Sequence, residues 1–271
     1  MKKRLLTLAA LLLAALMLCL SLTGCAKKHY GPYNLLKDGV LQVGSEIGYP
    51  PFEMKSDDGT EYIGLDMELG KLIADKLGLK FEVVESDFET ILKGLGTDRY
   101  DIVMSAITIT PERKKNDCDF SAPYIKNWQA IVVKRGSAPV TSPEGLAGLS
   151  VAYQEGTTSF EYLKRLRDTG AVNCEVSEYK KILNCFDDLK LGRVDAVLCD
   201  SVVAEGYVAR DPSTYEITWH QSTVEGEEPE LFGIAIKQGN IPLQEAIDKV
   251  LAELEADGTM DQLRDEWLKS Q

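Results

Sequence analysis

The chain has 271 residues, 44% of them hydrophobic, which is enough for one large or two modest domains with real cores. It carries 43 acidic and 30 basic residues, giving a formal charge of −13 at pH 7. This acidic balance argues against nucleic acid as a partner, because phosphate binding requires a basic face. It suits solubility and, weakly, a cationic ligand.

The N-terminal residues have the composition of an export signal. Three basic residues at 2–4 precede an apolar run at 5–22, and small residues then stand directly before Cys25. The pattern resembles the lipobox of bacterial lipoproteins, in which cleavage leaves the cysteine as the first residue and a lipid on its sulfur. A plain signal peptide or an uncleaved membrane anchor is the alternative. We expect residues 1–24 to be a lipoprotein signal peptide and 25–37 a lipid-anchored tether at the outer face of the cell membrane.

Cysteine and histidine usage gives no metal signature. The mature chain keeps four cysteines, namely Cys118, Cys174, Cys185 and Cys199. Any of three disulfide connectivities is open to them, but none of the spacings resembles a framework, so buried thiols are the default. There is no CxxC pair and there are only two histidines, so neither zinc nor any other metal or cofactor is expected.

The first strand is predicted at 40–43, and a loop with two glycines and two prolines follows it. The loop presents Glu46, Tyr49 and Phe52. An aromatic side chain on a rigid loop at the carboxyl end of a strand can form a platform for a small ligand. An isolated aromatic is as often a core residue, and for Phe52 both interpretations stay open.

The next elements alternate between helices and strands. A turn at 57–59 precedes a helix at 65–77 with one apolar stripe, a strand at 80–84, a helix at 87–95 and a strand at 100–104. The order β-α-β-α-β predicts a parallel sheet with helices on both faces.

The segment after this last strand combines features of an anion site. Hydroxyl residues follow the strand, and Thr110 and Pro111 mark a helix start, because Thr caps helices well and Pro suits the first helical position. Arg113 falls in the first turn. Helix N–H groups and a guanidinium fork together suit a carboxylate. The alternative is that Arg113 is a surface charge.

A second set of alternating elements follows. A strand at 128–134 is expected to cross between two lobes, a short helix at 142–146 follows, and a strand is predicted at 150–154. Thr157 and Thr158 then begin a helix, and their backbone N–H groups can bind an anion, although the turn can also be a simple helix cap.

The remaining elements return to the first lobe. A helix at 185–191 leads to a buried strand that ends in Asp200, whose alternative role is to cap the helix at 201–207. A strand at 231–237 then re-enters the first lobe, and helices at 242–255 and 261–267 close the chain. The chain therefore runs from lobe one to lobe two and back.

Five motifs in this order carry a family resemblance, namely YPPF, GLDMELGKLIADKLG, the region around Asp87-Phe88, SAITITPERKK and DFSAPY. Together they resemble family 3 of the bacterial solute-binding proteins, which serve ABC transporters of polar amino acids, over essentially the whole mature chain. The resemblance implies an α/β, bilobal periplasmic-binding-protein type II fold with a two-strand hinge. Lobe 1 would comprise 38–127 plus 233–271, and lobe 2 would comprise 128–232.

The same resemblance implies a binding site for the backbone of an amino acid. Arg113 and the N–H groups of Thr108 and Thr158 would hold the α-carboxylate. Asp200, the Ser105 carbonyl and the Thr108 hydroxyl would hold the α-ammonium. Other implied contacts are Tyr49 and Phe88, as a sandwich for the side chain, and Ala106, through its backbone alone. Further candidates are Phe52, Gln154 and Thr157.

Side-chain specificity is expected to rest on Glu46, which matches a family position that contacts the distal end of the ligand. A carboxylate there favours a guanidinium, ammonium or amide donor, and the neutral Gln154 disfavours an acidic ligand. The expected ligand is a basic amino acid, delivered by a monomer to an ABC transporter permease. A glutamine or cystine binder is the alternative within the class, and a dehydratase-like enzyme or a sensor lies outside it. No GxSxG or HExxH motif is present.

Overall fold

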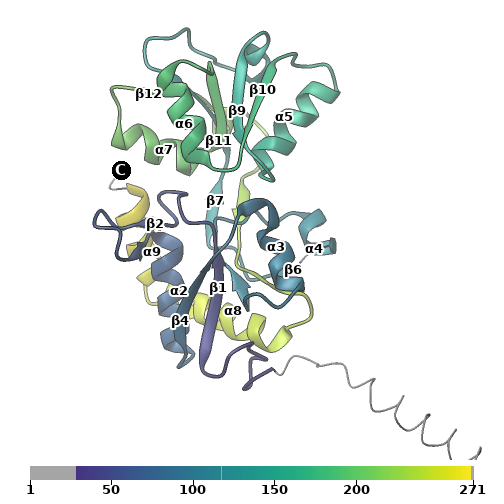
Figure 1. The fold of residues 1–271 in the computed structure, drawn as a ribbon, viewed down its shortest axis with the longest axis vertical. Helices are drawn as coiled ribbons and strands as arrows, with labels where there is room; N and C mark the ends of the chain where they lie inside the picture. The colour runs from purple at the N-terminus through teal and green to yellow at the C-terminus, as the bar shows by residue number, and fades with distance from the viewer. Residues whose placement is uncertain (1–28, 117, 270–271) are drawn as a thin grey trace, which may run out of the picture.

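The computed structural model describes residues 29–116 and 118–269, and these form two α/β lobes stacked along the long axis of the molecule (Figure 1). The described residues build one five-stranded sheet in each lobe and two short two-stranded sheets. The bilobal α/β fold expected from the sequence is confirmed. Within the described part of the chain, no helix is both long and apolar enough to span a bilayer. Cys25 and the expected signal segment lie outside the described residues.

The sheet of lobe 1 has three parallel strands and two strands that are antiparallel to their neighbours. In spatial order the strands are β4 (Lys80–Glu85), β1 (Val40–Ser45), β5 (Ile102–Val103), β14 (Ala235–Lys237) and β6 (Cys118–Phe120). The parallel part matches the predicted β-α-β-α-β order. The sheet as a whole is mixed, because the chain returning from lobe 2 inserts β14 between β5 and β6.

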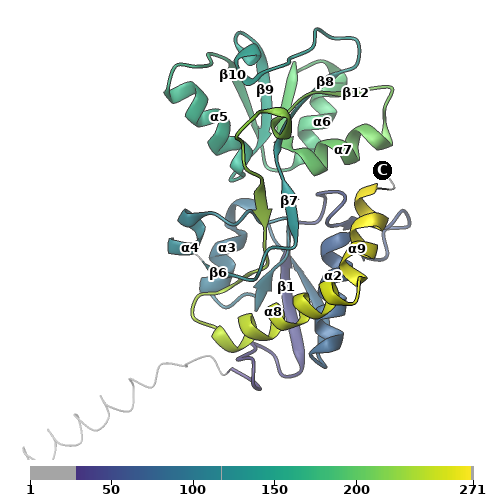
Figure 2. The same ribbon diagram turned by 180° about the vertical axis from the view of Figure 1, so that it is seen from behind.

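Helices cover both faces of this sheet. One face packs against α2 (Leu65–Lys76), α8 (Ile241–Ala256) and α9 (Thr259–Arg264), and the chain continues into a π-helical turn (Asp265–Lys269). The last two helices run along the rear of the lobe (Figure 2). The other face packs against α3 (Phe88–Gly96), with α4 (Pro111–Asn116) beside it. A hairpin of β2 (Met54–Lys55) and β3 (Tyr62–Ile63) contains the turn predicted at 57–59.

Lobe 2 repeats the same topology. Its sheet runs β10 (Glu175–Tyr179), β9 (Ser150–Gln154), β11 (Ala196–Asp200), β8 (Gln129–Lys134) and β12 (Tyr215–His220). One face packs against α5 (Thr158–Asp168), and the other packs against α6 (Ile182–Leu191) and α7 (Ser201–Arg210). Short 3-10 turns at η1 (Pro143–Leu146) and η2 (Gln221–Thr223) complete the lobe. The sequence analysis did not predict β10 or β12.

The lobes are joined by β7 (Ile125–Asn127) and β13 (Glu230–Phe232), which pair antiparallel and run side by side between them (Figure 2). The expectation that 128–134 crosses between the lobes is wrong, because those residues form β8 inside the lobe 2 sheet. The strand expected at 231–237 is split into β13 and β14. As a result, β13 pairs with β7 in the hinge, and β14 joins the sheet of lobe 1.

The cysteines of the described chain are buried, in agreement with the expectation for four mature thiols. No disulfide joins any of these four, which are Cys118, Cys174, Cys185 and Cys199. Packing in the apolar interior, rather than cross-linking, therefore explains their burial.

Candidate functional site

The candidate residues lie at the junction of the lobes, where the carboxyl ends of the parallel strands of the two sheets face each other. Loops leave the carboxyl ends of β1 and β5 in lobe 1 and of β9 and β11 in lobe 2. In open α/β sheets this edge is where ligands bind. Among the hydrogen bonds that pass directly between the lobes, those at three places involve a charged side chain from the sequence prediction.

Arg113 lies at the first of these places. Thr110 caps α4, since its Oγ1 accepts from the backbone N–H of Arg113 at 3.2 Å, as predicted. The guanidinium donates to the carbonyl of Thr108 at 2.8 Å and, across the cleft, to that of Gly156 at 3.0 Å. It also lies 5.8 Å from the ring centre of Phe88. The side chain therefore turns into the junction of the lobes, and the alternative of a free surface charge does not describe it.

Asp200 lies at the second place, buried at the end of β11. Its side chain makes no capping hydrogen bond to α7, so the alternative role as a helix cap is not realised. Instead Oδ2 accepts from the hydroxyl of Tyr49, in lobe 1, at 2.5 Å, and Oδ1 accepts from Asn127 at 2.7 Å. Burial, followed by the charge of Glu230, raises the pKa of Asp200 to about 7.

Glu230, which the sequence analysis did not single out, belongs to the same cluster. It begins β13, and its Oε2 accepts from the Thr158 hydroxyl at 2.8 Å and from the Gln129 amide at 3.0 Å. Burial raises its pKa, while these hydrogen bonds and the charge of Arg113 lower it. The signal in the sequence was its charge and its position directly before the strand expected at 231–237.

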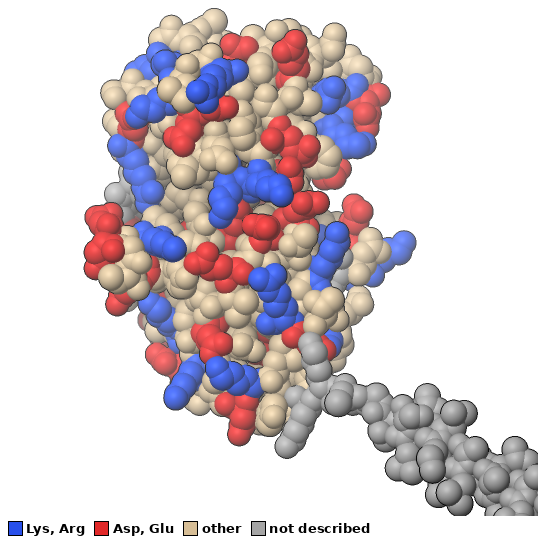
Figure 3. All heavy atoms as spheres, viewed as in Figure 1, with Lys and Arg blue, Asp and Glu red and all other residues tan. Residues whose placement is uncertain are grey.

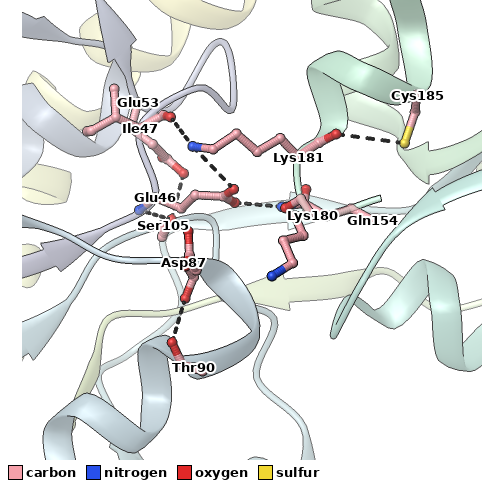
Figure 4. A network of polar contacts seen from close by, with 10 residues as sticks. All are labelled: Glu46, Ile47, Glu53, Asp87, Thr90, Ser105, Gln154, Lys180, Lys181 and Cys185. Carbon is pink, nitrogen blue, oxygen red and sulfur yellow. Dashed lines mark hydrogen bonds and ion pairs between the residues drawn. The ribbon is translucent and has the colours of Figure 1, made fainter. Parts of the chain in front are cut away.

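Glu46 lies at the third place and is 3% exposed. The amide of Gln154, in lobe 2, donates to its Oε2 at 2.6 Å, and Lys181 Nζ lies 3.9 Å from its Oε1 (Figure 4). Lys181 also donates to the carbonyl of Ile47 at 3.3 Å. Burial raises the pKa of Glu46 to about 7, against the lowering effects of Gln154 and Lys181. The carbonyl oxygen of the Gln154 side chain is buried without a hydrogen-bond partner among the described residues.

Ser105 and Ala106 form the loop after β5 and lie behind Glu46. The hydroxyl of Ser105 accepts from the backbone N–H of Glu46 at 3.0 Å and donates to Glu53 at 2.7 Å. Ala106 has a φ of 48°, a left-handed conformation that is uncommon for a residue with a side chain. Its backbone N–H donates to Asp66 at 2.9 Å, which holds that conformation in place.

Two of the further candidates have structural roles. Phe52 is fully buried, and its ring packs edge-on against Phe232 in the core of lobe 1. This packing favours the core interpretation of Phe52, and its role as a ligand platform stays a prediction. Thr157 is the N-cap of α5, where its hydroxyl accepts from the N–H of Phe160 and donates to the carbonyl of Gln154 at 2.7 Å. The cap interpretation describes its side chain.

A groove of about 590 Å³ runs along the lobe junction beside the guanidinium of Arg113. It is lined by residues of α3, α4 and α5, including Phe88, Arg113 and Thr158, and by Glu230 of β13. In the space-filling view the waist of the molecule is notched on the side of α4 and α5, and basic and acidic side chains mix around it (Figure 3). The groove thus reaches Arg113 and Glu230 from the surface.

The arrangement defines the chemistry that the junction can hold. A guanidinium on lobe 1 and a carboxylate on lobe 2 oppose each other, which is the pairing that a zwitterion requires. A further buried carboxylate, Glu46, lies at the third place, in the same loop as Tyr49. These features are those of a binding cleft between two hinged lobes. No cluster that could hold a metal ion occurs among the described residues.

Comparison with known proteins places the chain in a family. Residues 41–270 match the bacterial extracellular solute-binding proteins, family 3, and the chain belongs to that family. It is 31% identical to the L-cystine-binding protein TcyJ of Escherichia coli K12, over 88% of this chain and 86% of that one. It is also 31% identical to the arginine-binding extracellular protein ArtP of Bacillus subtilis 168, over 95% and 96%.

Solved structures agree with this placement. An ancestral arginine-binding protein bound to arginine is 40% identical, with a TM-score of 0.78, over 84% of this chain and 98% of that one. The ancestral amino acid-binding protein AncCDT-1, a precursor of cyclohexadienyl dehydratase, is 35% identical, with a TM-score of 0.76, over 85% and 96%. The type II periplasmic-binding-protein fold and the family resemblance expected from the sequence are thereby confirmed.

Proposed function

We propose that this protein captures a polar L-amino acid, with a basic one fitting best, and delivers it to the permease of an ABC transporter. The observation that carries the proposal is the buried carboxylate of Glu46 at the lobe junction, opposite Gln154. Arg113 and Asp200 supply the two charges that a zwitterion needs, and Glu46 adds a further negative charge. The relatives named for arginine and cystine support a polar amino acid as the ligand.

The backbone of the ligand lies between the two lobes in this proposal. Its α-carboxylate binds Arg113 and the N–H groups of Thr108 and Thr158. Its α-ammonium binds Asp200, where it competes with the hydroxyl of Tyr49 for Oδ2. The Ser105 carbonyl and the Thr108 hydroxyl complete the ammonium site.

The side chain of the ligand extends between Tyr49 and Phe88 towards Glu46. A guanidinium or ammonium gains a charge-assisted hydrogen bond from this carboxylate. The buried carbonyl oxygen of Gln154, which lacks a partner in the described structure, offers a second acceptor on the opposite lobe. Arginine suits this pair best, because its planar fork carries several donors, whereas lysine carries a single ammonium.

Hinge closure couples binding to delivery. A ligand that touches both lobes binds the closed form better, so it shifts the equilibrium by the difference in affinity between the two forms. The lobe boundaries expected at 127/128 and 232/233 coincide with the ends of β7 and β13, the hinge pair. The closed form is then the one that the permease recognises.

Location and state complete the proposal. The family is extracellular by description, which supports capture outside the cytoplasm. We infer that the protein acts as a monomer tethered through a lipid on Cys25. We also infer that it binds rather than converts its ligand. AncCDT-1, a precursor of an enzyme, is itself described as an amino acid-binding protein.

Calorimetry and thermal-shift measurements on residues 26–271 with the common amino acids test the proposal. A ligand that binds only the folded protein raises the melting temperature with its excess over Kd. Shifts with arginine, lysine or ornithine support it. Shifts with glutamine or cystine keep the class and overturn the choice of side chain. No shift with any amino acid refutes the proposal and returns attention to a sensor or enzyme role.

A further inference from the structure

Two carboxyl groups lie buried together behind the proposed site, and the site does not use them. Glu53 leaves the loop after β1, and Asp66 lies in the first turn of α2. Both residues have 0% exposure. They are neighbours, because the backbone N–H of Asp66 donates to the carbonyl of Phe52, the residue before Glu53, and the adjacent residues Ser105 and Ala106 donate to the two carboxyl groups. Two neighbouring carboxyl groups can hydrogen-bond to each other only when one of them carries a proton.

The hydrogen-bond donors around the pair identify which group carries it. Both oxygens of Asp66 accept from donors, one from the N–H of Ala106 at 2.9 Å and the other from the hydroxyl of Tyr124 at 2.7 Å. On Glu53, Oε1 accepts from the hydroxyl of Ser105 at 2.7 Å. The other oxygen, Oε2, meets no donor in the described part of the chain. Oε2 is thus the atom that has a free position for the proton.

We propose that Glu53 and Asp66 share one proton, carried by Oε2 of Glu53, and that this acid pair positions both loops at the ligand end of lobe 1. The shared proton leaves the pair with one negative charge instead of two. This permits full burial of the pair, because two adjacent buried charges are costly. The role of the pair in positioning the ligand loops rests on the proposed function, whereas the assignment of the proton to Glu53 does not.

Contacts lead from the acid pair to each loop. Through the Ser105 hydroxyl, Glu53 fixes the backbone N–H of Glu46, the residue proposed to choose the ligand (Figure 4). Through the N–H of Ala106, Asp66 fixes the left-handed turn after β5. Through Tyr124, it also reaches the chain directly before the hinge strand β7. The acid pair therefore links both ligand loops to the hinge.

The start of α2 is fixed on the same loop. The backbone N–H groups of Leu65 and Asp66 donate to the carbonyls of Pro51 and Phe52, each at 3.0 Å. Gly64 has a φ of 124°, and a Cβ at this position would lie 2.3 Å from the carbonyl oxygen of Phe52. Only glycine therefore permits the approach that brings Asp66 against Glu53.

The charged surroundings favour a bound proton. Burial is the main cause that raises the pKa of Glu53, followed by the charge of Asp66, with Glu46 adding to it and the Ser105 hydroxyl opposing it. The tyrosines that face the pair, Tyr49 and Tyr124, have raised pKa values and stay neutral.

Two isosteric substitutions distinguish the acid from its conjugate base. Glu53→Gln keeps a donor towards Asp66 and an acceptor towards Ser105, so its ligand affinity should stay within about twofold of the natural protein. In Asp66→Asn, the N–H group of the new amide faces the N–H of Ala106 or the hydroxyl of Tyr124, which are themselves donors. This substitution should weaken ligand binding by about tenfold or more. Asp75→Asn, on the exposed side of α2, is the matched control and should change nothing. Equal effects of the first two substitutions, or the reverse order, would overturn the assignment.

Infrared spectroscopy gives a readout that a merely structural role does not move, and it remains informative if Asp66→Asn fails to fold. The full-length protein at pH 7 should show the carbonyl bands of protonated carboxyl groups. Glu53→Gln should remove one of them, while the bands of Glu46 and Asp200 remain. A difference spectrum without that band would refute the shared proton. If no amino acid binds the protein at all, the proposed function fails while the infrared result still decides the protonation of Glu53.

Discussion

Replacement of Glu46 by glutamine should stabilise the unliganded protein while it weakens binding. The pKa of this carboxyl rises from 4.5 to about 7 in the folded chain, with burial as the main cause. Between these two values the folded state holds a proton that the unfolded state has lost. The free energy of unfolding therefore falls as the pH rises through this window, by about 3 kcal/mol at 1.36 kcal/mol per pKa unit.

Glu46→Gln removes this cost because glutamine does not ionise. Above pH 7 the variant should gain about 3 kcal/mol, which corresponds to a rise of about 5–10 °C in melting temperature for a chain of this size. Near pH 4.5 the gain should vanish. Glu245→Gln, an exposed position on α8, is the control and should show no such trend. Thermal unfolding between pH 4.5 and 8 measures both variants.

Ligand affinity should move in the opposite direction. Loss of the charge-assisted hydrogen bond should cost a basic ligand about 1.5–3 kcal/mol, or roughly 10–150-fold in Kd at pH 8. In the natural protein the same affinity should fall as the pH drops below 7, because Glu46 then takes up a proton, and the variant should lack that dependence. An unchanged affinity for arginine together with an unchanged melting temperature at pH 8 would refute the assignment and place Glu46 at the solvent rim.

Three further outcomes follow from the proposed site. Arg113→Lys keeps the charge but loses the fork, so calorimetry should find an affinity lower by about tenfold or more, and full affinity would place the ligand carboxylate elsewhere. Asp200→Asn should weaken amino acids by about 100-fold without lowering the melting temperature of the unliganded protein, whereas a sharp drop would make Asp200 structural. Cys25→Ser should release the protein from the membrane on fractionation, and retention there would contradict the lipid anchor.

Sequence patterns predicted the parts of the fold that local chemistry determines. The one-sided stripe of α2, the capped start of α4 at Thr110 and the buried strand that ends in Asp200 all depend on neighbours in the chain. The crossing segments depend on distant partners instead. Residues 128–134 have the apolar run of any buried strand, so nothing local distinguished β8 from a hinge strand.

The site was predictable to a similar degree. Arg113, Asp200 and Glu46 follow strand ends and carry charge, and the structure brings each to the lobe junction. Phe52 stands on the same loop as Tyr49, and only the packing of Phe232, far along the chain, assigns it to the core. Glu230 was missed for the same reason, since its partners Thr158 and Gln129 lie far from it along the chain.

The strand order of the lobe 1 sheet has a consequence for the order in which this chain can fold. Lobe 2 is built from one continuous stretch, whereas the sheet of lobe 1 needs β14 between β5 and β6, over a hundred residues after β5. Contacts of such sequence separation slow folding. The early strands β1, β4 and β5 therefore remain an unfinished sheet until the last part of the chain is available. A chain stopped before β14 is expected to hold a compact lobe 2 beside an open lobe 1. If residues 1–24 are the export signal expected from the sequence, this delay would keep the leading segment extended during its transfer across the membrane.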